Sequence, residues 1–272
     1  MSRTEALERL DEITRRLRVE CPWDREQDER SIVPHTVEEA YELADAAHRR
    51  DDAKLLDELG DVLFQVHFLA LLLEERGAGD LAAVAENCTE KLIRRHPHVF
   101  GEASAATAGE VLRNWDLIKR DEAGREPGIF GEVPENLPSP LYARKVQRRA
   151  ASSGFDFPGV DEAVGAVREE LEEVHAVARE APDAREERDA PDAREERFHE
   201  VGDLLFAAVN LARKVRVDPE LALRAASDRF RARVEAAGEL AASESRSWND
   251  LRPDEQLSYY AKVRLSEESR RP

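Results

Sequence analysis

Apolar residues recur at helical spacing through most of the chain. Between residues 59 and 73 they stand at positions i, i+3, i+4, i+7, i+11 and i+14, and a similar series runs from Leu204 to Val215. This period is typical of an α-helix with one buried face, whereas a strand alternates apolar and polar positions. Ala, Leu, Glu and Arg dominate, and no run of β-branched residues bounded by turn residues stands out. The pattern predicts an all-α fold.

A segment rich in proline and glycine divides the chain. Residues 124–140 read GREPGIFGEVPENLPSP, a composition that cannot continue a helix. We therefore expect an N-terminal helical domain over residues 1–123, a linker over 124–140 and a C-terminal helical domain over 141–272.

The two halves repeat each other. The segment VEEAYE at 37–42 recurs as REELEE at 168–173, and DELGDVLF at 57–64 recurs as HEVGDLLF at 199–206. The longer spacing in the second half coincides with a tandem duplication at 182–199, PDAREERDA followed by PDAREERFH. Its charge and its prolines favour a solvated loop or an extended helix. The halves are interpreted as diverged copies of one helical unit.

Charge and cysteine content narrow the class of protein. The net charge of −18 disfavours binding to nucleic acid or to an acidic membrane surface. Two cysteines without a spacing pattern indicate reduced thiols rather than a disulfide framework. The charged first twenty residues do not resemble a signal peptide, and the apolar stretch Val62–Leu73 is too short to span a membrane. We expect a cytoplasmic protein.

Paired carboxylates are the chemically informative feature of the repeat. On a helix, Glu39 and Glu42 project from one face beside Glu38, and Glu58 and Asp61 do the same on the next helix. Two antiparallel helices would aim these acids at one place, where oxygen ligands suit Mg²⁺ or Mn²⁺ and not zinc. The second half repeats the set as Glu169, Glu170, Glu173, Glu200 and Asp203.

The position of Asp61 argues against a merely solvated acidic face. It lies in a mostly apolar helix, as does Asp203 in the second half, and burying an unpaired carboxylate there is costly. We therefore expect each of these two acids to be buried and to bind a cation together with the other acids of its own set.

The residues that follow the acids differ between the halves. The second acidic stripe continues into Asn210, Arg213 and Lys214, whereas the first ends in apolar residues from Phe68 to Leu72. A polar and basic stripe beside a metal site suits a phosphorylated ligand. The second half is therefore predicted to carry most of the catalysis.

The motifs together resemble the MazG family of nucleoside triphosphate pyrophosphohydrolases. The resemblance spans residues 21 to 262 in family order, and the order and duplication of the motifs make it specific. It is carried by CPWD at 21–24 with Gln27, the two EExxE and ExxD pairs, RRHPHVF at 94–100, WxxxK at 115–119, KxQ at 145–147, GFD at 154–156 and NLAR at 210–213.

The resemblance implies a fold, a reaction and residue roles. The fold would be two tandem helical units that contribute to four-helix bundles in a homodimer. The reaction would split a nucleoside triphosphate into a monophosphate and pyrophosphate with Mg²⁺, for which Mn²⁺ could substitute. The metal would be held by the acids of each set, Glu169 would activate the water, and Glu38 would be an auxiliary acid. Substrate would be bound by Asn210, Arg213, Arg229, Arg233 and Lys262, and in the first half by Lys91, Arg95, Trp115 and Lys119.

Departures from the pattern and alternatives remain. Ser258 stands where the first half has Trp115, with Tyr259 or Tyr260 as possible substitutes, and Lys54 precedes Glu58 where Glu196 precedes Glu200. A carboxylate-bridged di-iron bundle would use Glu-x-x-His, which occurs at 172–175 and 196–199 but has no counterpart in the first half. A non-catalytic helical regulatory protein is the other alternative, and two complete acidic sets disfavour it.

Overall fold

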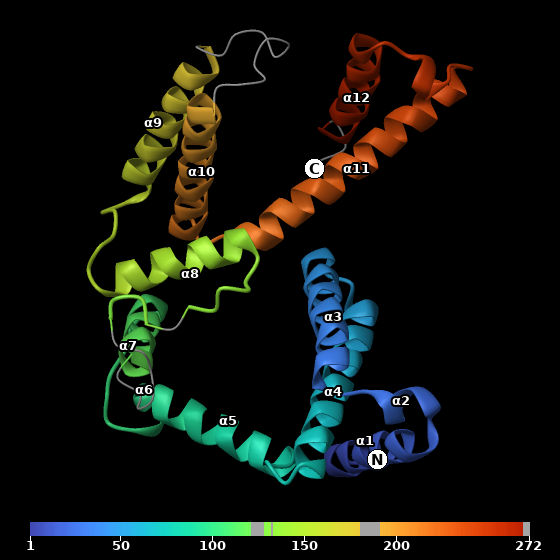
Figure 1. The fold of residues 1–272 in the computed structure, drawn as a ribbon, viewed down its shortest axis with the longest axis vertical. Coiled ribbons are helices and arrows are strands. Elements are labelled where there is room, and N and C mark those ends of the chain that lie inside the picture. Colours follow the sequence, from blue (N-terminus) through green and yellow to red (C-terminus); the bar gives the residue numbers. More distant parts are fainter. Residues whose placement is uncertain (121–127, 132, 180–190, 269–272) are drawn as a thin grey trace. The chain divides into compact units, whose positions relative to one another are not determined.

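The computed structural model describes residues 1–120, 128–131, 133–179 and 191–268, without the side chains of residues 112, 113, 116, 117, 119, 120, 191 and 192. All regular elements within these ranges are helices, so the predicted all-α fold is confirmed (Figure 1). The chain divides into two compact units, Met1–Lys119 and Arg120–Pro272. The expected linker lies in the second unit, and its residues 124–127 and 132 fall outside the described ranges. The limits of the two domains therefore stay a prediction.

The first unit is built around a long helical hairpin. Its helices are α1 (Arg3–Glu20), α2 (Pro22–Glu26), α3 (Glu29–Arg49), α4 (Asp52–Glu75), α5 (Leu81–Arg95), α6 (Pro97–Phe100) and α7 (Ala108–Arg120), the last ending at the border of the unit.

A tight turn joins α3 and α4. Arg50 ends α3 in the left-handed conformation, and the Asp51 side chain accepts a hydrogen bond from the Lys54 backbone N–H to cap α4. Ile32 of α3 packs against Phe68 and Leu72 of α4 in a buried cluster. The hairpin thus buries one face of each helix, as the apolar spacing predicted.

Helix α1 packs on the far end of α4 through paired charges. Arg18 donates to Glu75 at 2.8 Å, and Arg15 donates to Glu74 at 2.9 Å. These ion pairs lie at the C-terminal end of α4, whereas the acids Glu58 and Asp61 lie in its first half.

The second unit repeats the hairpin and adds a second one. Its helices are α8 (Ser139–Ser152), α9 (Val160–Arg179), α10 (Pro191–Lys214), α11 (Pro219–Ser243), the short 3-10 helix η1 (Trp248–Asp250) and α12 (Pro253–Glu268). Helix α9 pairs with α10, and α11 pairs with α12 around a core that includes Ala237, Leu251 and Tyr259.

Helix α8 connects the two hairpins of this unit. The Gln147 side-chain amide donates to the Phe206 carbonyl of α10 at 2.8 Å, and Arg144 forms an ion pair with Asp218, which caps α11. A single helix therefore contacts both α10 and α11.

The second copy of the duplicated segment extends α10. Residues 191–199 form its first turns, whereas 182–190 lie outside the described residues.

None of the described helices is long and apolar enough to cross a membrane.

Candidate active site

Each long hairpin brings acids from two helices together. Oxygen atoms of Glu39 on α3 and of Glu58 and Asp61 on α4 lie within 4.8 Å of one another. We call these three residues with Glu42 the first acidic cluster. The i, i+3 spacing on facing helices produces this arrangement, as the sequence indicated.

The same arrangement occurs in the second unit. Oxygen atoms of Glu170 and Glu173 on α9 and of Glu200 on α10 lie within 4.8 Å of one another. We call these three residues with Asp203 the second acidic cluster. Glu169 and Glu38 are exposed beside the second and the first cluster.

The acids repel one another within each cluster. Partial desolvation, followed by the charges of Asp61, Glu42 and Glu58, raises the pKa of Glu39. Desolvation and the charges of Glu173 and Asp203 likewise raise the pKa values of Glu170 and Glu200. Carboxylate oxygens are the ligands that a hard divalent cation prefers, and such a cation would relieve whatever repulsion a neighbouring positive side chain does not already balance.

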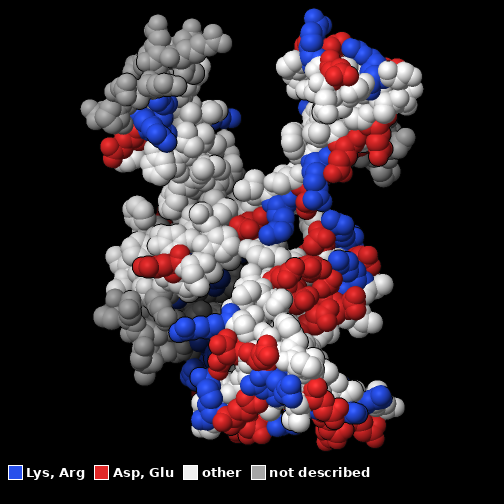
Figure 2. Space-filling model, turned by 45° about the vertical axis from the view of Figure 1, so that its right-hand side comes forward, with Lys and Arg blue, Asp and Glu red and all other residues white. Residues whose placement is uncertain are grey.

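The expectation that Asp61 and Asp203 are buried is wrong for this chain. Both are exposed, and Glu58 is the buried acid of the first cluster, with 4% of its surface accessible. Leu59 and Leu63 of the same helix are exposed as well, so the apolar stripe is broader than the face that the hairpin covers. Figure 2 shows acidic atoms gathered over the α3–α4 hairpin, with basic atoms beside them.

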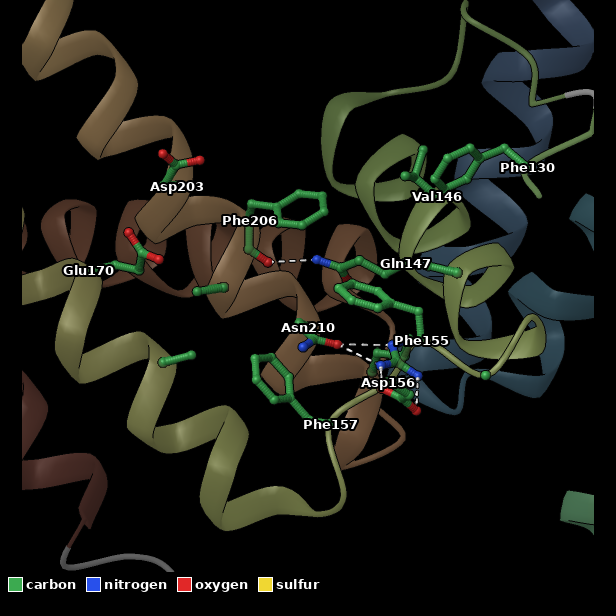
Figure 3. A pocket seen from close by; sticks show the side chains of 15 residues that line it. Phe130, Val146, Gln147, Phe155, Asp156, Phe157, Glu170, Asp203, Phe206 and Asn210 are labelled. Atoms are coloured by element: carbon green, nitrogen blue, oxygen red, sulfur yellow. Dashed lines mark hydrogen bonds and ion pairs between the residues drawn. The ribbon is translucent and has the colours of Figure 1, made fainter. Parts of the chain in front are cut away.

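A pocket adjoins the second cluster. Its volume is about 520 Å³, and its wall includes Glu170 and Asp203 (Figure 3). The remaining wall is mostly apolar and comes from the segment before α8, from α8 to α10 and from the loop before α9: Phe130, Val146, Gln147, Ala150, Gly154, Phe155, Asp156, Phe157, Ala166, Phe206, Ala207, Asn210 and Arg213.

Asp156 fixes the loop that carries two of the pocket's aromatic rings. It forms ion pairs with Arg213 and with Lys214, the latter at 2.9 Å, and Lys214 also donates to the Phe157 carbonyl. Burial alone would raise the pKa of Asp156, but hydrogen bonds from Arg213 and Lys214 hold this pKa below its usual value. Phe155 and Phe157 on either side of Asp156 are thereby held at the pocket.

Asn210 and Arg213 lie at the pocket as neighbours on α10. The Asn210 side-chain oxygen accepts hydrogen bonds from Arg213 at 2.7 and 3.0 Å, which leaves the Asn210 amide nitrogen as a donor. The Arg213 guanidinium is shared between Asn210 and Asp156. Both predicted substrate-binding residues therefore line the pocket, and Arg213 also holds its wall.

Two of the three predicted phosphate-binding cations of the last hairpin, Arg233 and Lys262, have partners on that hairpin. Arg233 on α11 pairs with Glu267 of α12 at 2.7 Å. Lys262 lies 3.6 Å from Glu244 and its ammonium is 4.6 Å from the centre of the Tyr259 ring. Arg229 is exposed on α11.

Their counterparts in the first unit lie on α5 and α7. Trp115 packs edge-on against His96, with ring centres 5.0 Å apart, and Lys91 and Arg95 are half-buried on α5. The Lys119 side chain lies outside the described residues. The contacts described for these residues do not reach the first acidic cluster.

Neither cluster includes histidine. The groups of described side chains close enough to share a metal ion contain carboxylates only, and His175 and His199 of the two Glu-x-x-His segments are exposed outside them. Carboxylate ligands alone are typical of a Mg²⁺ or Mn²⁺ site, whereas a di-iron bundle uses both carboxylate and histidine ligands.

Sequence reasoning missed most of the pocket wall. Phe130, the loop residues Phe155 and Phe157, and Phe206 come from three separate segments, and the sequence pattern included Phe155 and Asp156 only through the GFD motif. The available signal was the Phe-Asp-Phe sequence after Gly154, in which aromatic residues flank a charge.

Comparisons with known proteins agree on one family. Residues 27–100 match the model of the MazG nucleotide pyrophosphohydrolase domain. The chain is 41% identical over 234 residues to the nucleoside triphosphate pyrophosphohydrolase of Escherichia coli K12, covering 84% of this chain and 85% of that protein. It is 37% identical over 250 residues to the nucleoside triphosphate pyrophosphohydrolase/pyrophosphatase MazG of Thermotoga maritima, covering 92% and 91%. A Mycobacterium tuberculosis nucleoside triphosphate pyrophosphohydrolase is 33% identical over 142 residues, covering 52% of this chain and 43% of that protein.

Proposed function

The chain belongs to the MazG family of nucleoside triphosphate pyrophosphohydrolases, and from this premise we propose that its main active site is the second acidic cluster with the adjoining pocket. There it hydrolyses a ribo- or deoxyribonucleoside triphosphate to the monophosphate and pyrophosphate.

One observation carries this proposal. Glu170 and Asp203 belong both to the second acidic cluster and to the wall of the pocket. A nucleotide has an aromatic base at one end and charged phosphates at the other, and the site has an aromatic chamber that opens onto carboxylates able to hold a cation. The volume of about 520 Å³ is typical of sites for small ligands.

The first cluster lacks this combination in the described part of the chain. The hollow beside it is lined by small, acidic and aliphatic residues and by one lysine: Asp51, Ala53, Lys54, Leu56, Asp57, Gly60 and Asp61. Without aromatic walls the hollow offers nothing for a base to stack on. This difference favours the second unit as the catalytic one.

The proposed cofactor is Mg²⁺, with Mn²⁺ as a substitute, held by Glu170, Glu173, Glu200 and Asp203. When bound, the cation neutralises phosphate oxygens around the attacked phosphorus. Desolvation and the charges of neighbouring acids raise the pKa values of Glu170 and Glu200, which supports this assignment because such carboxylates gain most from a shared cation.

Glu169 is proposed to activate the attacking water. It directly precedes Glu170 on α9 but projects in a different direction, and its side chain is exposed. Its carboxylate would accept the water's proton as the oxygen attacks the α-phosphorus. The bond to the β-phosphate then breaks, and pyrophosphate leaves with the bridging oxygen.

The remaining polar groups are proposed to bind the nucleotide. The Asn210 amide nitrogen is available to an acceptor on the base or sugar, and Phe155, Phe157 and Phe206 would surround the base. The β- and γ-phosphates would be bound by Arg229, Arg233 and Lys262. For this, Arg233 would leave its ion pair with Glu267, and Lys262 would leave its ion pair with Glu244.

A mostly apolar chamber distinguishes bases weakly. Stacking tolerates any base, whereas strong selection needs several buried polar contacts. This supports a broad substrate range and a role in clearing unwanted nucleotides from the nucleotide pool.

We further propose that the protein acts as a homodimer. Large apolar side chains are exposed on both long hairpins, among them Leu56 at 75% and Phe198 at 77%. A second copy would cover these faces and build the four-helix arrangement that the acidic hairpins lack alone.

The decisive experiment is product analysis. Incubation of the purified chain with nucleoside triphosphates and Mg²⁺ should give monophosphate and pyrophosphate in equal amounts without diphosphate, and EDTA should stop the reaction. Orthophosphate and diphosphate as first products, or full activity in EDTA, would contradict the proposal.

A further inference from the structure

A lysine ammonium lies among the acids of the first cluster. The Lys54 Nζ is 3.3 Å from Glu58 Oε1 and 3.5 Å from Glu42 Oε2. Glu58 belongs to the same helix, one turn later, whereas Glu42 comes from the facing helix α3. The lysine therefore bridges the two helices at the place where their carboxylates converge.

The two carboxylates that hold Lys54 differ in burial. The Glu58 side chain retains 6% of its exposure, whereas Glu42 retains 46% and Lys54 retains 44%. A buried carboxylate needs a positive partner because it has lost most of its contact with water. Lys54 supplies that partner from within the chain.

The corresponding position in the second unit carries the opposite charge. Glu196 precedes Glu200 by one helical turn, as Lys54 precedes Glu58. After desolvation and the effects of Glu173 and Asp203, the charge of Glu196 also raises the pKa of Glu200. At this matching helical position, one cluster therefore has a lysine and the other has an additional acid.

We propose that Lys54 acts as the built-in cation of the first acidic cluster and excludes divalent metal ions from it. The charge at this position then decides which of the two clusters takes up metal. The inference concerns the first cluster and does not need the second to be catalytic.

The physical basis is competition for the same oxygens. A divalent cation that enters the first cluster would displace the ammonium from Glu42 and Glu58 or lie close to its charge. The lysine is attached to α4 and loses only side-chain freedom in holding its place, whereas a free ion gives up water ligands to bind. Removing the ammonium would leave four carboxylates beside an open hollow, which a metal ion can enter from solvent.

The test uses Mn²⁺ binding to the full-length chain, with free Mn²⁺ measured by electron paramagnetic resonance. The second cluster is first silenced by Glu173→Ala with Glu200→Gln, so that the remaining binding reports the first cluster. Into this background are placed Lys54→Ala, Lys54→Met, which keeps the apolar stem, and Lys54→Glu. Arg49→Ala is the matched control, because Arg49 has the same charge and pairs with Asp45 on the same hairpin.

The background chain should bind Mn²⁺ weakly, and Lys54→Ala and Lys54→Met should strengthen binding about tenfold or more. Lys54→Glu should strengthen it further, and Asp61→Asn should abolish the gain. Arg49→Ala should leave binding unchanged. Circular dichroism identifies the variants that retain the helical fold and can be compared.

Two results would overturn the inference. One is that the Lys54 variants bind Mn²⁺ no better than the background chain. The other is that the background chain already binds Mn²⁺ tightly and loses it on Asp61→Asn.

A reciprocal variant separates this inference from the proposed function. In the otherwise native chain, Glu196→Lys should weaken Mn²⁺ binding at the second cluster by about tenfold, because it introduces the same internal cation. Absence of Mn²⁺ from the second cluster of the native chain would contradict the proposed function, yet the comparison at the first cluster would still decide the role of Lys54.

Discussion

Asp156 shows how one residue links the packing of a loop to the shape of a site. It accepts hydrogen bonds from Arg213, while Lys214 lies within ion-pair distance, and only 29% of its side chain is exposed. A partly buried carboxylate with two cationic partners is held more firmly than one in a surface pair. Arg213 thereby supports the pocket wall in addition to any contact with a ligand.

Asp156→Asn is expected to destabilise the chain in a pH-dependent manner. Because the pKa of Asp156 is lowered in the folded state, its contribution is fully present above the ordinary Asp pKa and is lost as the pH falls through the folded pKa. At neutral pH the variant should lose about 1–2 kcal/mol of unfolding free energy, measured by urea denaturation. In strongly acidic solution the two proteins should converge.

Asp228→Asn is the control for this comparison. Asp228 is 3.8 Å from Arg231 in an exposed pair, so its loss should change stability little at any pH. A constant difference between Asp156→Asn and the native chain across the acidic range would contradict the ion-pair explanation.

At the scale of elements, the α3–α4 and α9–α10 hairpins share one arrangement of acidic residues. Both place acids at i, i+3 on facing helices and bring three carboxylates within 4.8 Å. They differ in their surroundings, because α8 and the loop before α9 wall a pocket only beside the second acidic cluster. The same local pattern therefore yields sites with different capacities for a nucleotide.

Substitutions in the two hairpins should have unequal effects. Glu173→Ala or Asp203→Ala should lower pyrophosphate release by about 100-fold or more, because each removes a proposed metal ligand. Glu42→Ala and Asp61→Ala should leave most of the activity. Initial rates at saturating Mg²⁺ measure the effect.

Glu172→Ala is a suitable control, since Glu172 is an exposed neighbour of Glu173 that belongs to neither cluster. If the first-hairpin variants lost activity and the second-hairpin variants kept it, the assignment of the main site would be reversed.

At the scale of the whole molecule, one chain leaves much apolar surface on its helices uncovered. On the α9–α10 hairpin, Leu171 is 54% exposed and Leu205 is 62% exposed. Large apolar side chains exposed on paired helices are typical of a face that packs against another chain. The helical period that predicted these elements does not indicate whether a face is covered by the same chain or by a second copy.

Leu205→Glu is expected to weaken the proposed dimer. The variant places a charge in the apolar face, and sedimentation equilibrium at micromolar concentration should show a shift from dimer to monomer. Leu265→Glu, at an exposed position on α12 outside the long hairpins, should leave the association unchanged. A native chain that is monomeric and fully active would refute the dimer proposal.

The sequence by itself determined the helices and the grouping of the acids. Both depend on residues three or four positions apart, which a helix places on one face whatever the rest of the chain does. The series from 59 to 73 became part of α4, and the pair Glu170 and Glu173 became one side of a cluster. The family resemblance added the order of the motifs, and comparison with known proteins supports it.

Only the tertiary structure decided which acids are buried and which groups share a site. Gln147 meets Phe206 across 59 positions, and Asp156 meets Arg213 across 57, so no local period could reveal the pocket. Periodicity also misplaced burial, because the breadth of an apolar stripe does not show how much of it a single partner helix covers. Glu58 is buried while Asp61 is exposed, since burial depends on what packs above each side chain.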